Sequence, residues 1–244
     1  MKLKIESIIQ TLIVDSGLSY YREPLFGYAK ADDPLFPKLK DIVGSDHLLP
    51  HNILPGARSV ASFFLPFKKE ISQNNRHGQL ATREWAEVYI KTNQLIETMT
   101  NTLKSSLAAQ NVGIESQPPT YFFDVDLLTA IWSHKHVAYI CGLGLFGQNH
   151  LLITPKGCNG RFGTIILDID LEPSPRPEQT HQCRYHSYGC HYCQEICPVK
   201  ALNEPVFKRQ LCYQQCLLND QTYNDLGSCE VCGKCATGPC GYIE

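Results

Sequence analysis

The stretch CRYHSYGCHYCQEICP, residues 183–198, decides how this chain is expected to fold and what it is expected to bind. Three of its cysteines, Cys190, Cys193 and Cys197, precede Pro198 with the spacing Cys-x2-Cys-x3-Cys-Pro. Bacterial two-cluster ferredoxins hold [4Fe–4S] clusters with cysteines at this spacing. A second run, CEVCGKCATGPC at residues 229–240, is similar. The two runs therefore predict a small ferredoxin-like module with two clusters.

The spacing also predicts which cysteines share a cluster. Two-residue spacings let one loop present three thiolates to one cluster, and the fourth cysteine of a run binds the neighbouring cluster. The expected ligand sets are Cys183, Cys190, Cys193 and Cys240 for one cluster, and Cys229, Cys232, Cys235 and Cys197 for the other. Structural zinc is the alternative, because Cys-x2-Cys pairs also form tetrahedral zinc sites. The triple spacing and Cys197-Pro198 favour iron–sulfur clusters.

Both runs depart from the reference spacing. The first has four extra residues before Cys190, and Ser187 stands at the usual place of the first ligand, so Cys183 is assigned that role. The second has one extra residue before Cys240. Four cysteines remain: Cys141, Cys158, Cys212 and Cys216. They are expected to be small buried apolar residues, although the four-residue spacing of the last two would place them on one helix face near a cluster.

Composition indicates an ordinary globular protein. Of its 244 residues, 43% are hydrophobic and 19% are charged, and the formal net charge is −2. This charge gives no general attraction to nucleic acid or to an anionic membrane. No apolar run reaches the roughly 18 residues of a membrane span, and the N-terminus lacks the features of a signal peptide. We therefore expect a cytoplasmic protein, in which the twelve cysteines bind metal rather than form disulfides.

The part before the cysteine runs is expected to form a larger domain. Apolar periodicity predicts an amphipathic helix at residues 5–13 that ends at Gly17, a buried strand at 59–67 and the longest helix at 85–107. Short apolar pieces at 121–128, 137–140, 151–154 and 164–169 suggest a mixed sheet packed against the two helices. Three prolines within residues 171–177 mark a boundary, which divides the chain into domains 1–172 and 173–244.

The most informative segment of the larger domain lies at residues 133–154. Its three glycines, Gly142, Gly144 and Gly147, would let the backbone approach a flat or phosphate-bearing ligand closely. The spacing is that of a dinucleotide fingerprint, but no strand and helix flank it convincingly, and Asp168, near the distance required of the acidic residue, lies in an expected strand. A plain structural turn stays open as an alternative.

Together these motifs resemble the epoxyqueuosine reductase family, which is related to the reductive dehalogenases. The resemblance runs from about Leu54 to Cys240 and is strongest in the glycine segment and the cysteine runs. It implies an α+β protein in which a nitroreductase-like mixed α/β domain binds cobalamin, followed by a small two-cluster ferredoxin-like domain that reduces the cobalt. A flavin is the alternative cofactor, since flavin enzymes also use the nitroreductase-like fold.

The resemblance also implies site residues. The family's glycine stretch contributes backbone to the corrinoid site, and its counterparts here are Ala138, Gly142, Leu143, Gly144, Phe146, Gly147 and Asn149. The family's Trp and Lys within this stretch are replaced by Leu145 and Gln148. The family's Arg-Asp-Tyr-His motif corresponds best to residues 83–86, so Glu84 would donate the proton, although the His is missing.

Five histidines enter the prediction with Glu84. His134 and His136 would face opposite sides of an extended segment, and His136 is the second candidate catalytic residue. The competing interpretations are a solvated first-turn acid for Glu84 and a structural imidazole for His136. His181, His186 and His191 surround the first cysteine run and are expected to bond backbone or cluster sulfur.

The expected function is a corrinoid-dependent oxidoreductase that acts on a small substrate. The alternative is an electron-transfer partner or reductive activator of another corrinoid protein. Either function needs an external electron donor such as ferredoxin or flavodoxin. In the family a helical-repeat segment after the ferredoxin module helps to hold tRNA; this sequence ends at Glu244 and has no basic excess, so tRNA is not expected as the substrate.

Overall fold

An antiparallel four-stranded sheet forms the centre of the structure, a computed structural model that describes residues 1–119, 123–178, 183–203 and 206–244. The strand order is β1-β2-β8-β3, from β1 (Leu25–Lys30), β2 (Ser59–Pro66), β8 (Gly160–Leu167) and β3 (Ile114–Glu115). β2 pairs with β8 from Ser59 opposite Leu167 to Pro66 opposite Gly160. All three strand pairings of this sheet are antiparallel, so the prediction of a mixed sheet was wrong for these strands.

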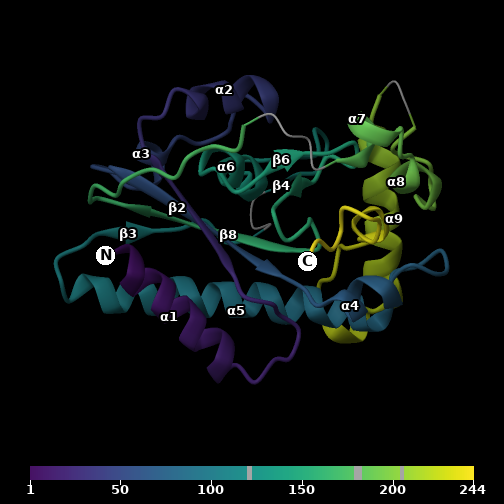
Figure 1. Ribbon diagram of the computed structural model, residues 1–244, viewed down its shortest axis with the longest axis horizontal. Helices are drawn as coiled ribbons and strands as arrows, with labels where there is room; N and C mark the ends of the chain where they lie inside the picture. The colour runs from purple at the N-terminus through teal and green to yellow at the C-terminus, as the bar shows by residue number, and fades with distance from the viewer. Residues whose placement is uncertain (120–122, 179–182, 204–205) are drawn as a thin grey trace.

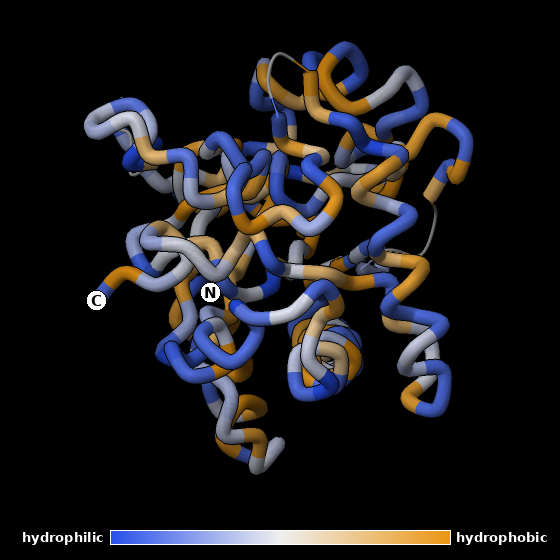
Figure 2. The backbone as a smooth tube through the Cα atoms, turned by 90° about the vertical axis from the view of Figure 1, so that its right-hand side faces the viewer, coloured by the Kyte–Doolittle hydropathy of each residue, from blue (hydrophilic) through white to orange (hydrophobic). Residues whose placement is uncertain are grey.

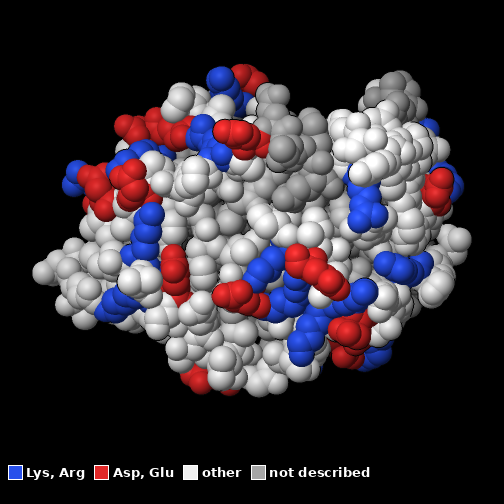
Figure 3. All heavy atoms as spheres, viewed as in Figure 1, with Lys and Arg blue, Asp and Glu red and all other residues white. Residues whose placement is uncertain are grey.

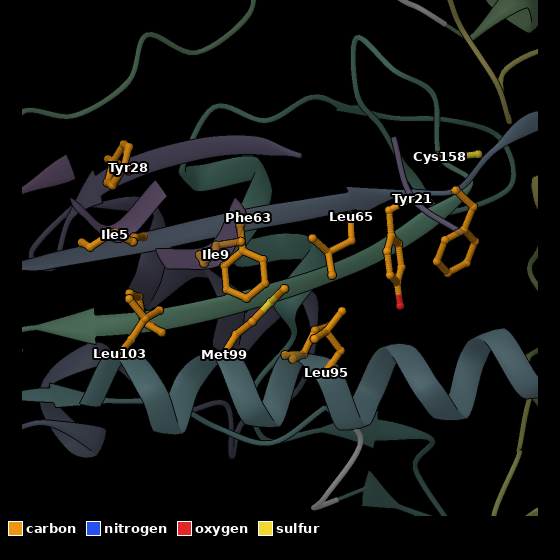
Figure 4. Close-up of a cluster of buried hydrophobic side chains, with 14 of the residues drawn as sticks. Ile5, Ile9, Tyr21, Tyr28, Phe63, Leu65, Leu95, Met99, Leu103 and Cys158 are labelled. Atoms are coloured by element: carbon orange, nitrogen blue, oxygen red, sulfur yellow. The ribbon is translucent and has the colours of Figure 1, made fainter. Parts of the chain in front are cut away.

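Helices cover both faces of the sheet, which explains why every residue of β2 is buried. On one face lie α1 (Lys2–Asp15) and α5 (Arg83–Ala108), which pack against Phe63 and Leu65 of β2. Figure 4 shows these two side chains directed toward Met99 and Leu95 of α5. On the other face, α2 (Leu35–Ile42) and α6 (His134–Ile140) pack against Val60. Alternate residues of β2 thus enter two different cores, as the strand geometry requires.

The longest helix begins and ends for identifiable reasons. Thr82 caps α5, because its Oγ1 accepts a hydrogen bond from the backbone N–H of Trp85 at 3.3 Å. The apolar residues predicted to form a stripe are buried in α5: Trp85, Val88, Tyr89, Leu95, Ile96, Met99, Leu103 and Leu107. α5 ends at Ala108, five residues before Gly113. The predictions of α1, β2 and α5 are therefore confirmed to within a few residues.

The remaining elements are short. In the first two thirds of the chain they are α3 (Pro50–Ile53), α4 (Lys69–Asn74), β4 (Phe123–Asp124), β5 (Thr129–Ala130), β6 (Leu145–Phe146) and β7 (Leu152–Ile153). The cysteine-rich part contains α7 (Arg184–Tyr188), α8 (Tyr192–Glu195), α9 (Arg209–Thr222) and the 3₁₀ turns η1 (Asn224–Leu226) and η2 (Lys234–Ala236). β4 pairs with β5, and β6 pairs with β7, each as a two-stranded sheet.

Two strand predictions need correction. Residues 137–140 belong to helix α6, because Val137, Ala138 and Ile140 are buried beneath the sheet at helical spacing. A short apolar run cannot be distinguished from a buried helix by periodicity alone. The strand predicted at residues 121–128 falls partly on residues 121 and 122, which lie outside the described residues, and only Phe123–Asp124 of its remainder is a strand. The strands predicted at 151–154 and 164–169 correspond to β7 and to the second half of β8.

The proline-rich segment lies along the sheet edge. The backbone N–H of Ser174 donates to the carbonyl of Tyr28 at 2.9 Å, and the Ser174 Oγ accepts from the Tyr28 N–H at 3.1 Å. Beyond it, the cysteine-rich part packs onto the larger part, since Cys183 and Ala236 belong to the same buried cluster as Ile5 of α1. The division into two domains at residue 172 stays a prediction.

Hydrophobic and hydrophilic segments are interspersed along the coloured part of the tube in Figure 2. Among the described residues, no helix has both the length and the hydrophobicity that a membrane span requires.

Replacing Leu103 of α5 with Ala should lower the free energy of unfolding by about 2–5 kcal/mol, because its side chain is fully buried in the core that α5 forms with α1 and the sheet. Leu3→Ala is the matched control, since 81% of Leu3 is exposed on α1, and its effect should stay within about 0.5 kcal/mol. Urea unfolding followed by circular dichroism measures both. Equal losses for the two variants would contradict this packing.

Candidate metal centre and ligand cavity

The first thiol group consists of Cys183, Cys190, Cys193 and Cys240, which line one small cavity beside α7 and α8. Burial is the main cause that raises the pKa of Cys193 to about 11, and the nearby Cys240 and Cys183 thiols raise it further. Thiols that affect one another in this way lie close together. These are the four residues that the spacing predicted for one cluster.

Helix α7 explains the unusual spacing of the first run. Cys183 immediately precedes α7, and the extra residues form this helical turn. The turn ends at Gly189, whose φ of +61° lets the chain bend back toward Cys190. A longer loop therefore still delivers Cys183 to the thiol group.

The second thiol group contains Cys197, Cys232 and Cys235, joined by Cys212 and Cys216 from α9. All five line a cavity of about 380 Å³, which we call the thiol cavity. Burial, followed by the Cys212 and Cys197 thiols, raises the pKa of Cys232 to about 11. A hydrogen bond from Cys216 lowers the pKa of Cys212 to about 7, which favours the thiolate that binds metal. Within the described ranges, no three His, Cys, Asp or Glu side chains converge on a single-ion site.

Cys229 lies apart from this group. Its Sγ is 3.9 Å from the carbonyl oxygens of Asn219 and Tyr223, and it is buried against Ala86 and Tyr89 of α5. Burial raises its pKa, and the charges that add to this effect belong to Asp220 and Asp225 rather than to cysteines. The structure thus brings Cys212, not Cys229, to Cys197, Cys232 and Cys235. The four-residue spacing of Cys212 and Cys216 was the only sequence signal for this arrangement.

Asn149 connects the glycine segment with the cysteine loops. Its Nδ2 donates to the Cys235 carbonyl at 3.1 Å and to the Cys158 Sγ at 3.6 Å, while its Oδ1 accepts from the Leu151 N–H at 3.2 Å. The Cys158 thiol hydrogen-bonds to Cys240, which raises the Cys158 pKa. Cys158 appears at the end of the buried cluster in Figure 4. Asn149 therefore contacts the second thiol group directly, through the Cys235 carbonyl, and the first indirectly, through Cys158 and Cys240.

A buried lysine fixes the turn between Cys232 and Cys235. Lys234 is 1% exposed, and its Nζ donates to the carbonyls of Asn75 at 2.8 Å and of His77 at 2.6 Å. The Asn75 side chain returns a hydrogen bond to the Cys232 carbonyl at 2.9 Å. The turn is therefore attached to the segment between α4 and α5.

A larger cavity, of about 810 Å³, lies between α2, α6, the β4–β5 hairpin and the N-terminal half of α9. We call it the ligand cavity. Its walls are mainly apolar and aromatic, with Phe123, Tyr139, Phe146, Phe207 and Tyr213 among them. It shares Lys135, His150, Phe207, Cys212 and Cys216 with the thiol cavity. A ligand in this cavity would therefore lie next to the second thiol group.

The glycine segment packs against the chain itself. A Cβ on Gly142 would lie 2.6 Å from the Pro175 carbonyl oxygen, and one on Gly144 would collide with the Ile153 carbonyl. One on Gly147 would lie 2.6 Å from the Ile153 side chain. The space that these glycines leave is therefore filled by protein atoms. This packing favours a structural turn over a binding surface for a corrinoid.

The other predicted cofactor-binding residues divide among three environments. Ala138 and Leu143 are buried in a core cluster with Phe64 and Leu152. Phe146 lines the ligand cavity, and Asn149 lines the thiol cavity. The structure therefore does not bring the seven predicted residues to one surface.

The two predicted catalytic residues also lie in different places. Glu84 is half-buried in the first turn of α5, where its Oε2 accepts a hydrogen bond from Asn74 at 2.8 Å, and it lines neither cavity. His136 lines the ligand cavity, with its Nδ1 2.7 Å from the Ser133 Oγ and its ring centroid 4.7 Å from that of Phe146. Burial, followed by the charge of Lys135, lowers the pKa of His136 to about 3. His136 is thus a neutral imidazole at neutral pH.

Two other histidines of the prediction, His134 and His191, contact polar side chains of the protein. His134 is on helix α6 rather than on an extended segment, and its Nδ1 is 2.9 Å from the Thr164 Oγ1. The Nδ1 of His191 is 2.7 Å from the Gln194 side chain. His181 lies outside the described residues.

Comparisons with known proteins agree with the resemblance. No family model matches the chain. The chain is 30% identical over 162 residues to the epoxyqueuosine reductase of Synechocystis sp. (strain ATCC 27184 / PCC 6803 / Kazusa), a match that covers 63% of this chain and 48% of that protein. The chain thus spans about half the length of this curated relative.

Two solved structures share the fold. An epoxyqueuosine reductase with an epoxyqueuosine-modified tRNA-Tyr stem loop superposes with a TM-score of 0.56 at 19% identity, over 96% of this chain and 65% of that chain. A catabolic reductive dehalogenase superposes with a TM-score of 0.55 at 10% identity, over 77% of this chain and 26% of that chain. At these identities the superpositions establish a common fold.

The His136 ring should keep one protonation state between pH 8 and pH 5, because burial places its pKa near 3. Below the usual histidine pKa of about 6.5, only the unfolded chain takes up this proton. The contribution of His136 to stability is therefore complete above that pH and declines as the pH falls toward 3. Ring chemical shifts by NMR measure the folded state, and the urea-unfolded chain is the control. An inflection near pH 6.5 in the folded protein would contradict the burial.

Proposed function

We propose that this epoxyqueuosine reductase-like chain is an iron–sulfur oxidoreductase whose two thiol groups hold [4Fe–4S] clusters and whose ligand cavity holds the electron acceptor. One observation carries the proposal: the three cavities are contiguous. Cys235 lines both the first thiol group's cavity and the thiol cavity, and Cys212 lines both the thiol cavity and the ligand cavity. The clusters, when bound, supply one-electron transfer.

The ligands follow from the positions of the thiols. Cys183, Cys190, Cys193 and Cys240 would hold the first cluster. Cys197, Cys212, Cys232 and Cys235 would hold the second, with Cys212 in the place that the spacing gave to Cys229. An all-thiolate donor set in two neighbouring groups suits two cuboidal clusters.

The chain's own residues position these ligands and separate the sites. Lys234 and Asn149 fix the loops that carry Cys232 and Cys235. Phe207 and His150 stack with ring centroids 4.6 Å apart, and both line the thiol cavity and the ligand cavity. This pair therefore forms part of the wall between the second thiol group and the acceptor.

The acceptor's identity is a separate question. The resemblance implies a corrinoid, but the glycine segment is closed by the chain's own backbone, so a corrinoid would have to occupy the ligand cavity. A flavin is the second candidate. An internal acceptor cavity beside Cys212 favours an enzyme over an electron-transfer partner without its own acceptor.

One relative is seen with a tRNA stem loop. For this chain a net charge of −2 still argues against tRNA as the substrate. A gel-shift experiment with an epoxyqueuosine-modified stem loop tests this, and a stable complex at physiological salt would contradict it.

Cys212→Ala should lower the iron content of anaerobically reconstituted protein from about eight to about four atoms per chain, because it removes one ligand of the second cluster. Cys229→Ala is the matched control and should keep about eight, because Cys229 lies apart among Ala86 and Tyr89. Iron, sulfide and cobalt analysis gives the readout, and circular dichroism confirms folding.

The reverse result, with iron lost from Cys229→Ala and kept in Cys212→Ala, would restore the ligand set expected from spacing. Reconstituted wild-type protein that binds zinc and no iron would overturn the proposed function itself. Cobalt in the same sample would identify a corrinoid as the acceptor.

A further inference from the structure

The ligand cavity is strongly cationic. Three basic side chains line it: Lys38 from α2, Lys135 from α6 and Arg209 at the start of α9. Its described lining contains no Asp or Glu. The cavity therefore concentrates positive charge on walls that are otherwise apolar.

Among the described residues, no acid forms an ion pair with these three cations. Lys38 and Arg209 have no ion pair or side-chain hydrogen bond to the described residues, and the Lys135 Nζ donates only to the His150 carbonyl, at 2.8 Å. Burial, followed by the charge of Arg209, lowers the pKa of Lys135. Both cations line the ligand cavity, and an anion within it would be attracted to both.

Two described acids near the cavity are engaged elsewhere. The Asp124 carboxylate accepts backbone N–H groups of its own hairpin loop, from Asp126 at 2.9 Å and Leu127 at 2.8 Å. Glu230 hydrogen-bonds to Tyr213 and lines the thiol cavity rather than the ligand cavity. Within the described lining, a negative charge facing these cations would therefore come from a bound ligand.

The N-terminus of α9 adds to the positive potential. This 14-residue helix begins at Arg209, and its N-cap residue, Lys208, makes no side-chain cap hydrogen bond. The helix dipole places partial positive charge at this end. The effect reinforces Arg209 at the side of the cavity that Cys212 shares with the thiol cavity.

Aromatic side chains form part of the remaining wall. The rings of Tyr139 and Phe146 lie 5.9 Å apart, and those of Phe123 and Tyr213 lie 5.4 Å apart. Such surfaces favour a planar ring, because paired aromatic rings attract one another beyond simple burial. The volume of about 810 Å³ suits a ligand of drug size.

We propose that the ligand cavity binds a planar aromatic ring that carries an anionic group, with the anion between Lys135 and Arg209 and the ring against Phe146 and Tyr139. The inference rests on the proposed function only in taking this cavity as the acceptor site. Two sources share this chemistry: an aromatic carboxylate acting as substrate, and the phosphate of a flavin mononucleotide acting as cofactor.

Two matched ligand pairs test the proposal by isothermal titration of the reconstituted protein. The first pair is 2-naphthoate and 2-naphthamide, and the second is flavin mononucleotide and riboflavin; within each pair the ring is the same and only one member carries the anion. The anionic member of at least one pair should bind about tenfold or more tightly than its neutral partner, a difference of about 1.4 kcal/mol. The pair that shows this preference identifies the source.

Neighbouring basic residues supply matched variants. Arg209→Gln should remove most of the preference for the anion and Lys38→Gln should reduce it, and both should leave the neutral ligand's affinity unchanged. Lys208→Gln and Lys40→Gln are the controls, because these lysines are exposed and outside the cavity lining, next to Arg209 and on the same helix as Lys38. Both controls should keep the wild-type preference.

Equal affinities within both pairs, or no binding of any of the four compounds, would overturn the proposal. The same holds if the control variants lose as much preference as the cavity variants. These outcomes are independent of iron content, so a chain that binds no iron but prefers 2-naphthoate would lose the proposed function and keep this inference.

Discussion

The attachment of the cysteine loops to the sheet and helices is the constraint on which the rest of the structure depends. Short loops that present several thiols to one point have almost no core of their own, so they must be fixed from outside. Lys234 does this with a buried ammonium that donates to the carbonyls of Asn75 and His77. Asn149 does the same from the opposite side, with hydrogen bonds to Cys235 and Cys158. Buried polar groups that are fully bonded hold one geometry, because any displacement leaves them unsatisfied.

The glycine segment shows how a binding fingerprint can serve packing. Gly142 and Gly144 allow the chain to approach the carbonyls of Pro175 and Ile153 at distances that a Cβ would forbid. The close approach at Gly142 lets the proline-rich segment lie against α6 and β1. The first cysteine run, which contains α7 and α8, follows this segment along the chain and lies near α9 (Figure 1). The segment thus acts on the proposed clusters by placing their ligands.

The balance of acidic and basic side chains differs between the outer surface and the ligand cavity. Acidic and basic side chains are interspersed over the face shown in Figure 3, in agreement with the small net charge of the chain. The ligand cavity departs from this balance, with three cations and no acid in its described lining. A cation beside an electron acceptor stabilises the negative charge that reduction adds. The cationic wall therefore assists both the binding of an anion and its reduction.

The sequence by itself determined the elements that depend on local pattern, namely α1, β2 and α5, because helical periodicity and a continuous apolar run act over short stretches of chain. It could not decide whether residues 137–140 form a strand or a helix, since a short buried run satisfies both. Only the tertiary structure decided that Cys212 lines the thiol cavity while Cys229 packs against α5, and that Phe146 and His136 face a cavity while Ala138 and Leu143 enter the core. These choices depend on which segments meet in space, and the packing of α9 against the rest of the chain sets that arrangement.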